Sequence, residues 1–211
     1  MRVKENFNKK LLVEGNDDQH VIWALCEKFK ISENFDVIDC EGIGKLYEQL
    51  PIRFKQSSIE TIGIIVDADT ELSDRWISLK TVLTNIGFAI PKDLPENGLI
   101  YKDNNLNVKI GVWIMPNNNL NGMLEDFMSF LVPKDDKLLP IVNQTLENIE
   151  NQNLNPYSLI HKSKVVIHSW LACQADPGTP MGQSITKKYL STDEETCKKL
   201  TNWLAEQHLA N

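Results

Sequence analysis

The sequence lacks a long apolar run, and no stretch of its 211 residues approaches the ~18 apolar residues that a membrane span requires. The N-terminal stretch MRVKENFNKKLLVEG is basic at first but contains no apolar segment, so we expect no signal peptide. Cysteine is scarce and scattered, at Cys26, Cys40, Cys173 and Cys197, without a Cys-x-x-Cys pair. This spacing argues against a zinc knuckle or a redox motif and predicts reduced thiols in a cytoplasmic protein.

The chain also lacks an excess of positive charge. Its formal net charge of −7 counts against broad, salt-driven adhesion to DNA or RNA. An enzyme that meets phosphate through bound cations is still compatible with this charge, because a metal ion reverses the local field. The 42% hydrophobic content supplies material for the full core of an ordinary globular protein.

Hydrophobic patterning predicts an α/β protein. Apolar runs bounded by turn residues indicate strands at 10–14, 35–40, 61–69, 98–102 and 108–115. Segments with helical spacing separate the first three strands, which favours a mostly parallel sheet flanked by helices. The runs KLLVE and IGIIV lack alternation, as expected of central strands that are covered on both faces.

Several local features refine this outline. We expect Asn16 to cap the first helix, Pro51 to interrupt the second, and residues 101–109 to form a hairpin. Beyond Pro133 helices are expected around 138–150, 161–174 and 193–209, with the segment ADPGTPMGQ (175–183) as a loop. Residues 1–132 therefore form the expected α/β core, and residues 133–211 a helical extension packed on it in the same compact unit.

Acidic residues follow two of the predicted strands. Glu14 ends one apolar run, while Asp67 and Asp69 end another. If these strands are neighbours, three carboxylates meet beyond the carboxyl edge of the sheet, where α/β proteins bind ligands. Mg²⁺ or Mn²⁺ is the usual cation for such oxygen-only donors. Asp17 and Asp18, in the next helical turn, either complement the helix dipole or serve as outer-shell metal ligands.

These motifs carry a family resemblance. LLVEGNDD followed about fifty residues later by IIVDAD resembles the Toprim domain of topoisomerases, primases and OLD-type nucleases, over roughly the first 130 residues. The whole chain is similar to bacterial single-domain Toprim-like proteins related to the OLD nucleases, through LVEGNDDQHVI, MPNNNLNGMLEDF and HSWLACQADPGTPMGQSI. The resemblance implies a Toprim/Rossmann-like sheet in which Glu14 is a general acid or base and Asp67 and Asp69 hold the metal.

Further residues are candidates for the same site. Gly15 lets the backbone or a phosphate approach closely just after the strand. OLD-type Toprims add an acid in a place comparable to Glu125, which implies an extra metal ligand, although an acid at a helix start also faces water readily. Lys162 and Lys164 either steady a phosphate or belong to a solvated helix end.

Three functions remain open at this point. The first is a Mg²⁺- or Mn²⁺-dependent phosphodiester enzyme, of nuclease type, acting on nucleic acid with or without a partner chain such as an ATPase. The second is a haloacid-dehalogenase (HAD)-type phosphatase with Asp67 as nucleophile, Asp69 as acid/base and Thr70 beside them, although that motif normally lies on the first strand of its domain. The third is a non-catalytic module that binds a nucleotide or a partner protein. The sequence does not set the oligomeric state.

Overall fold

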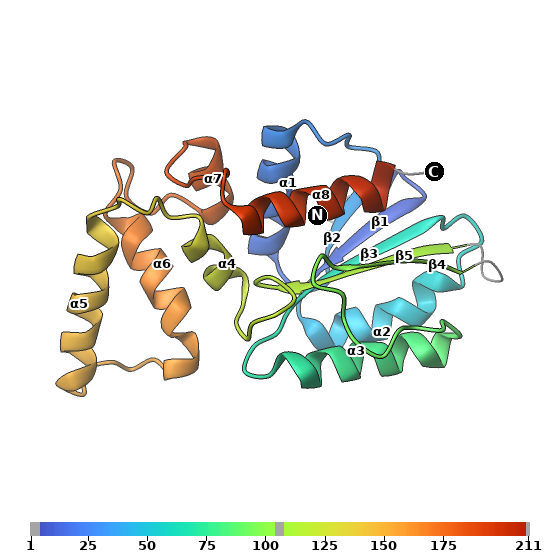
Figure 1. Ribbon diagram of the computed structural model, residues 1–211, viewed down its shortest axis with the longest axis horizontal. Helices are drawn as coiled ribbons and strands as arrows, with labels where there is room; N and C mark the ends of the chain where they lie inside the picture. Colours follow the sequence, from blue (N-terminus) through green and yellow to red (C-terminus); the bar gives the residue numbers. More distant parts are fainter. Residues whose placement is uncertain (1–4, 104–107, 210–211) are drawn as a thin grey trace.

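The computed structural model describes residues 5–103 and 108–209 (Figure 1). Five strands form one sheet in the order β2-β1-β3-β5-β4, with β4 antiparallel to β5 and the remaining pairs parallel. Their bounds are β1 (Lys9–Val13), β2 (Asp36–Asp39), β3 (Thr61–Asp67), β4 (Leu99–Asp103) and β5 (Val108–Met115). The predicted α/β class with a mostly parallel sheet is confirmed.

The two acid-bearing strands are neighbours in the centre of the sheet. Val13 of β1 pairs with Ile65 of β3, and Asp67 at the end of β3 pairs with Met115 of β5. The side chains of these strands are almost completely buried, which explains their continuous apolar runs. The register places Glu14 and Asp67 at the same carboxyl edge.

Helices cover both faces of the sheet. In Figure 1, α2 (Ile43–Phe54) and α3 (Leu72–Ile86) lie on one face, and α1 (Asn16–Phe29) and α8 (Glu195–Leu209) on the other. Two apolar cores result, one around Ile64 and Val112 and one around Trp113 and Trp203. The parallel strands require this arrangement, because both of their faces are apolar.

The helical character after Pro133 is also confirmed. The remaining helices are α4 (Leu124–Phe130), α5 (Leu138–Asn151), the short 3₁₀ helix η1 (Leu159–His161), α6 (Lys162–Ala172) and α7 (Met181–Thr186). The chain then returns to the sheet through α8, where Trp203 Nε1 donates a hydrogen bond to Leu99 O at 3.0 Å. Gln207 Nε2 likewise donates to Ile62 O at 3.3 Å. The boundary expected at residue 132 stays a prediction.

Some local predictions were wrong. Helix α2 continues through Pro51, because the proline removes one hydrogen bond near the helix end while Leu46 and Leu50 remain packed on the sheet. Helix α1 is capped by Gly15 and already includes Asn16. The segment expected to be a loop at 175–183 enters α7 at Met181. The predicted hairpin at 101–109, in contrast, agrees with the antiparallel pairing of Tyr101 with Ile110 and of Asp103 with Val108, and residues 104–107 of its turn lie outside the described residues.

None of the described helices is long and apolar enough to cross a membrane. All four cysteines are unpaired thiols, and three of them, Cys26, Cys40 and Cys197, are buried.

Candidate functional site

The site begins where β1 and β3 end. The Glu14 side chain reaches across to the neighbouring strand, where its Oε2 accepts a hydrogen bond from the Asp67 backbone N–H at 3.3 Å. Asp67 in turn accepts a hydrogen bond at Oδ1 from the Leu124 backbone N–H, at 2.9 Å. Two strands and the start of α4 therefore converge on this pair of carboxylates.

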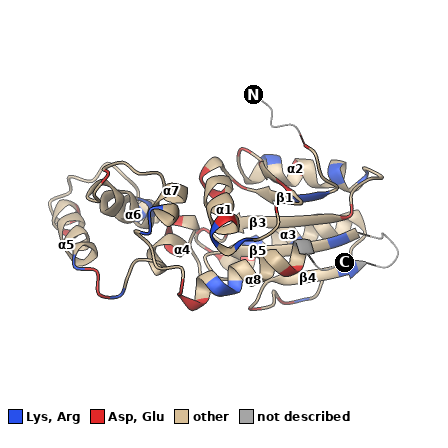
Figure 2. Cartoon of the chain, turned by 90° about the horizontal axis from the view of Figure 1, so that it is seen from above, with Lys and Arg blue, Asp and Glu red and all other residues tan. Residues whose placement is uncertain are grey.

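The start of α1 contributes a third carboxylate. Asp18 lies one helical turn after Gly15, and its Oδ2 accepts a hydrogen bond from the Gly15 N–H at 3.1 Å. Its other oxygen, Oδ1, is buried and has no hydrogen-bond partner among the described residues. Asp18 is only 6% exposed, whereas Asp17 is exposed. Figure 2 shows acidic residues of α1 beside β3.

Glu125, from the first turn of α4, supplies a fourth carboxylate, which is buried like that of Asp18. Its Oε1 lies 3.1 Å from the Lys164 ammonium of α6, so two candidates from distant parts of the sequence meet here. The Glu125 side chain is 5% exposed, which rules out the reading of a helix-start acid facing water. Lys162 instead pairs with Glu150 of α5 at 2.7 Å, away from the other acids.

Asp69 has a different environment. Its backbone adopts a positive φ of 54°, and its N–H and C=O form reciprocal hydrogen bonds with Gly122, both at 2.8 Å. Its carboxylate forms an ion pair with Arg75 of α3. Gly122 must be glycine, because its φ is +133° and a Cβ there would lie 2.6 Å from Asp126 Oδ2.

Arg75 was not predicted as a site residue; its ion pair with Asp69 joins the first turn of α3 to the loop that precedes it. No periodic signal marks such a pair, since Asp69 precedes α3 and Arg75 lies in its first turn. The Arg75 side chain is mostly buried, at 14% exposure, and its charge also acts on Glu14.

Crowding raises the proton affinity of the buried acids. Burial, followed by the nearby charges of Asp18, Glu14 and Glu125, raises the pKa of Asp67 well above its usual value. Burial and the Glu14 charge raise the pKa of Asp18 to about 7. Burial also raises the pKa of Glu14, against the hydrogen bond from the Asp67 N–H. Burial alone would lower the pKa of Lys164, but the Glu125 carboxylate raises it above its ordinary value.

The carboxylate oxygens of the site are the donor type that divalent cations such as Mg²⁺ prefer. Within the described ranges, no three histidine, cysteine, aspartate or glutamate side chains are arranged to hold a metal ion as they stand. Nevertheless, the four buried or partly buried acids offer only oxygen ligands, which Mg²⁺ and Mn²⁺ prefer. The buried, unpartnered Asp18 Oδ1 is an atom that a cation would satisfy. In donor chemistry alone, these acids are of the kind that a hard cation prefers.

Fold and site together define an α/β protein with a cluster of carboxylates at the carboxyl edge of a mostly parallel sheet. Residues 8–208 match the family described as Protein of unknown function (DUF3226), so the chain belongs to this family. No curated protein and no solved structure matches the chain significantly.

Proposed function

We propose that the protein is a Mg²⁺- or Mn²⁺-dependent phosphodiester-processing enzyme of nuclease type, acting on nucleic acid. One observation carries the proposal: Glu14, Asp18, Asp67 and Glu125, from four elements, lie near enough for their charges to raise the pKa values of Asp18 and Asp67, while one Asp18 oxygen stays buried and unpartnered. Clustered carboxylates are unfavourable without a counterion, so a folded protein retains them where they bind something.

Asp67 and Glu125 would hold the cation. Asp18, expected from the sequence only as an outer-shell ligand, would bind it directly. Asp69 would join them once its carboxylate turns from Arg75. An ion held by these carboxylates would supply Lewis-acid chemistry to a phosphodiester.

Other roles belong to side chains of the chain itself. The raised pKa of Glu14 lets it exchange a proton closer to neutral pH, which suits a general acid or base. Lys164 is 52% exposed, so its ammonium group can leave Glu125 and contact a phosphate. Gly15 adds no side chain at the entrance, where a substrate backbone would pass close to the N-terminus of α1.

The resemblance to the Toprim domain supports this reading: Glu14 directly follows β1, and Asp67 ends β3 two residues before Asp69, in the order of the Toprim motifs. The net charge of −7 and the scattered Lys and Arg residues in Figure 2 offer little generic attraction for nucleic acid. We therefore infer that efficient turnover involves a partner chain, such as an ATPase. The unpaired thiols favour a cytoplasmic location.

The test is cleavage of supercoiled plasmid and of single-stranded DNA and RNA in Mg²⁺ or Mn²⁺. Glu14→Gln and Asp67→Asn should each abolish cleavage, and Asp17→Asn should leave it intact because Asp17 faces solvent. Cleavage that is unchanged in the Glu14 and Asp67 variants would come from a contaminant and would remove the assignment.

A non-catalytic binding module is the second candidate. It is favoured by the two internal counterions, since Lys164 already pairs with Glu125 and Arg75 with Asp69. Metal binding by calorimetry without turnover of any polynucleotide would support this candidate. Release of phosphate from p-nitrophenyl phosphate, lost in Asp67→Asn, would instead support the HAD-type phosphatase.

A further inference from the structure

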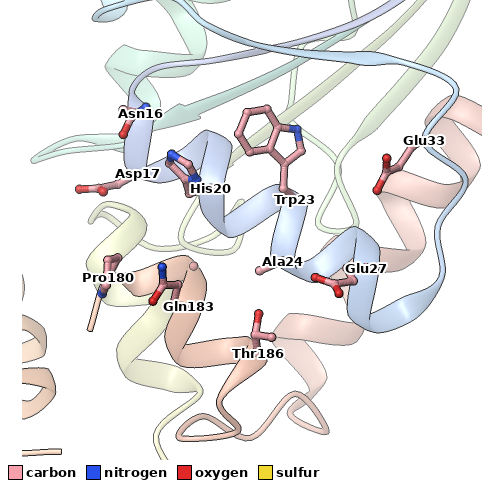
Figure 3. A pocket seen from close by; sticks show the side chains of 11 residues that line it. Asn16, Asp17, His20, Trp23, Ala24, Glu27, Glu33, Pro180, Gln183 and Thr186 are labelled. Atoms are coloured by element: carbon pink, nitrogen blue, oxygen red, sulfur yellow. The ribbon is translucent and has the colours of Figure 1, made fainter. Parts of the chain in front are cut away.

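A groove runs along the outer side of α1, where the short helix α7 packs against it (Figure 3). The two helices approach closely: a Cβ on Gly182 of α7 would lie 2.6 Å from the His20 carbonyl oxygen. Polar and aromatic side chains line this groove, among them Asp17, His20, Trp23, Glu27, Glu33 and Gln183. None of them belongs to the cluster of buried carboxylates described above.

Trp23 is the unusual feature of the groove. The other tryptophans, at positions 76, 113, 170 and 203, are buried, whereas Trp23 is 38% exposed. His20 lies one turn earlier and meets the indole edge-to-face, with ring centroids 5.2 Å apart and an interplanar angle of 86°. This contact fixes the indole in place while leaving part of its surface open to a ligand.

The charge of the groove is uniformly negative. Asp17, Glu27 and Glu33 line it, and no lysine or arginine does so among the described residues. Glu27 lies four residues after Trp23, on the same face of α1. Neither the Glu27 nor the Glu33 carboxylate has an ion pair or a hydrogen bond in the part of the chain that the structure describes.

We propose that this groove binds an organic cation, an alkylammonium or guanidinium group, between the Trp23 indole and the carboxylates of Glu27 and Glu33. The indole surface attracts a cation through its quadrupole, and the unpaired carboxylates supply charge and hydrogen-bond acceptors. The same carboxylates repel phosphates, so the groove is not a path for the nucleic-acid backbone. The inference stands independently of the chemistry at the buried acids.

Such a cation has two sources, a Lys or Arg side chain of a partner polypeptide or a free polyamine. The experiment titrates the full-length chain with argininamide, with spermidine and with a peptide of alternating Gly and Arg residues. Binding is measured by calorimetry and by Trp23 fluorescence, which dominates the solvent-sensitive tryptophan signal because the other four indoles are buried. The uncharged analogue citrullinamide keeps the shape of argininamide without its charge.

We expect saturable binding of the cations and none of citrullinamide. Trp23→Leu should weaken binding about threefold, as expected for loss of an exposed cation–π contact. The double variant Glu27→Gln/Glu33→Gln should weaken it about tenfold, while Glu147→Gln, an exposed acid on α5, should leave it unchanged. A higher affinity for the peptide than for spermidine identifies a partner protein as the source, and the reverse order identifies a polyamine.

Three results would overturn the inference. The first is equal binding of citrullinamide, and the second is an unchanged affinity in the double variant. The third is the absence of saturable binding of all three cations. Because the substituted side chains line an open groove, unchanged thermal unfolding serves as the check that each variant is folded.

Discussion

Asp17 and Asp18 are adjacent at the start of α1, yet they differ in burial and therefore in electrostatic environment. Asp17 is exposed, whereas Asp18 is buried against Glu14, Asp67 and Glu125, with one oxygen unpartnered. A buried carboxylate without a counterion is costly in its charged form. Asp18 therefore links the stability of the protein both to pH and to the presence of a cation.

Replacing Asp18 by asparagine should stabilise the metal-free protein at neutral and higher pH. The pKa of Asp18 rises from 3.8 to about 7 on folding, so its favourable contribution is complete below pH ~4 and is lost as pH rises through ~7. A neutral amide at this position has no such loss, and the variant should gain on the order of 1–3 kcal/mol above pH 7. Urea unfolding across this pH range in a chelator measures the difference.

The same substitution should have the opposite effect with Mg²⁺ or Mn²⁺ present, because the variant loses a charged ligand. Asp17→Asn is the matched control and should change neither the pH profile nor the stabilisation by metal, since Asp17 faces solvent. If the free energy of unfolding depended on pH identically in wild type and Asp18→Asn, burial and nearby charges would not destabilise the charged form of this carboxylate.

Part of the site was predictable from single residues. Glu14 and Asp67 each end an apolar run, and the parallel sheet brings such ends to one edge. The sequence did not distinguish Asp17 from Asp18, because both fit the first turn of a helix and only the rotation of α1 decides which is buried. The Glu125–Lys164 and Asp69–Arg75 pairs depend on packing between elements, which local patterns do not contain.

Among the elements, α7 shows most clearly how tertiary packing overrides composition. The segment DPGTPMGQ has the composition of a loop, yet α7 begins at Met181 because Gly182 lets it pack directly on the α1 backbone. The same holds for α2, where Leu46 and Leu50 keep the helix intact through Pro51. The strands were predictable because a buried strand depends on its own apolar run rather than on a particular partner.

We predict that Gly182→Ala destabilises the protein by about 1–3 kcal/mol, because the new methyl group must displace the His20 backbone or shift α7. Gly44→Ala is a matched control: it also lies at the second position of a helix, but a Cβ there meets nothing within 4 Å. The control should be neutral or slightly stabilising. Equal unfolding midpoints for the two variants in urea would show that α7 does not pack tightly on α1.

At the scale of the whole molecule, the last helix completes the core that the first strands begin. Trp203 and Leu204 of α8 are buried in the same apolar cluster as Val13 of β1 and Trp113 of β5. Gln207 lies so close to Gly111 that a Cβ at that glycine would be 2.4 Å from the Gln207 side chain. Residues of the C-terminal extension thus form part of the sheet's covering layer.

A chain that ends at residue 132 should therefore fail to unfold cooperatively. Truncation exposes one apolar face of the sheet around Trp113 and Met115, and this loss exceeds the usual net stability of a domain. Far-UV and near-UV circular dichroism during urea unfolding measure the loss. Addition of residues 133–211 as a separate chain should restore a single transition, and a sharp transition of the truncated chain alone would contradict the prediction.

The negative overall charge should make nucleic-acid binding depend on a divalent cation. With a net charge of −7 and clustered acids at the site, the metal-free protein should not bind a single-stranded oligonucleotide detectably at physiological salt. Mg²⁺ should create binding, because it neutralises the carboxylates and offers coordination positions to phosphate oxygens. Oligonucleotide binding is measured by fluorescence anisotropy with the Glu14→Gln variant, which lacks the acid–base group but keeps the other acids, so that the substrate is not cleaved. Ca²⁺ serves as a second cation that should also support binding. Binding of equal strength in a chelator would mean that the nucleic acid attaches elsewhere and that the acidic edge is not its site.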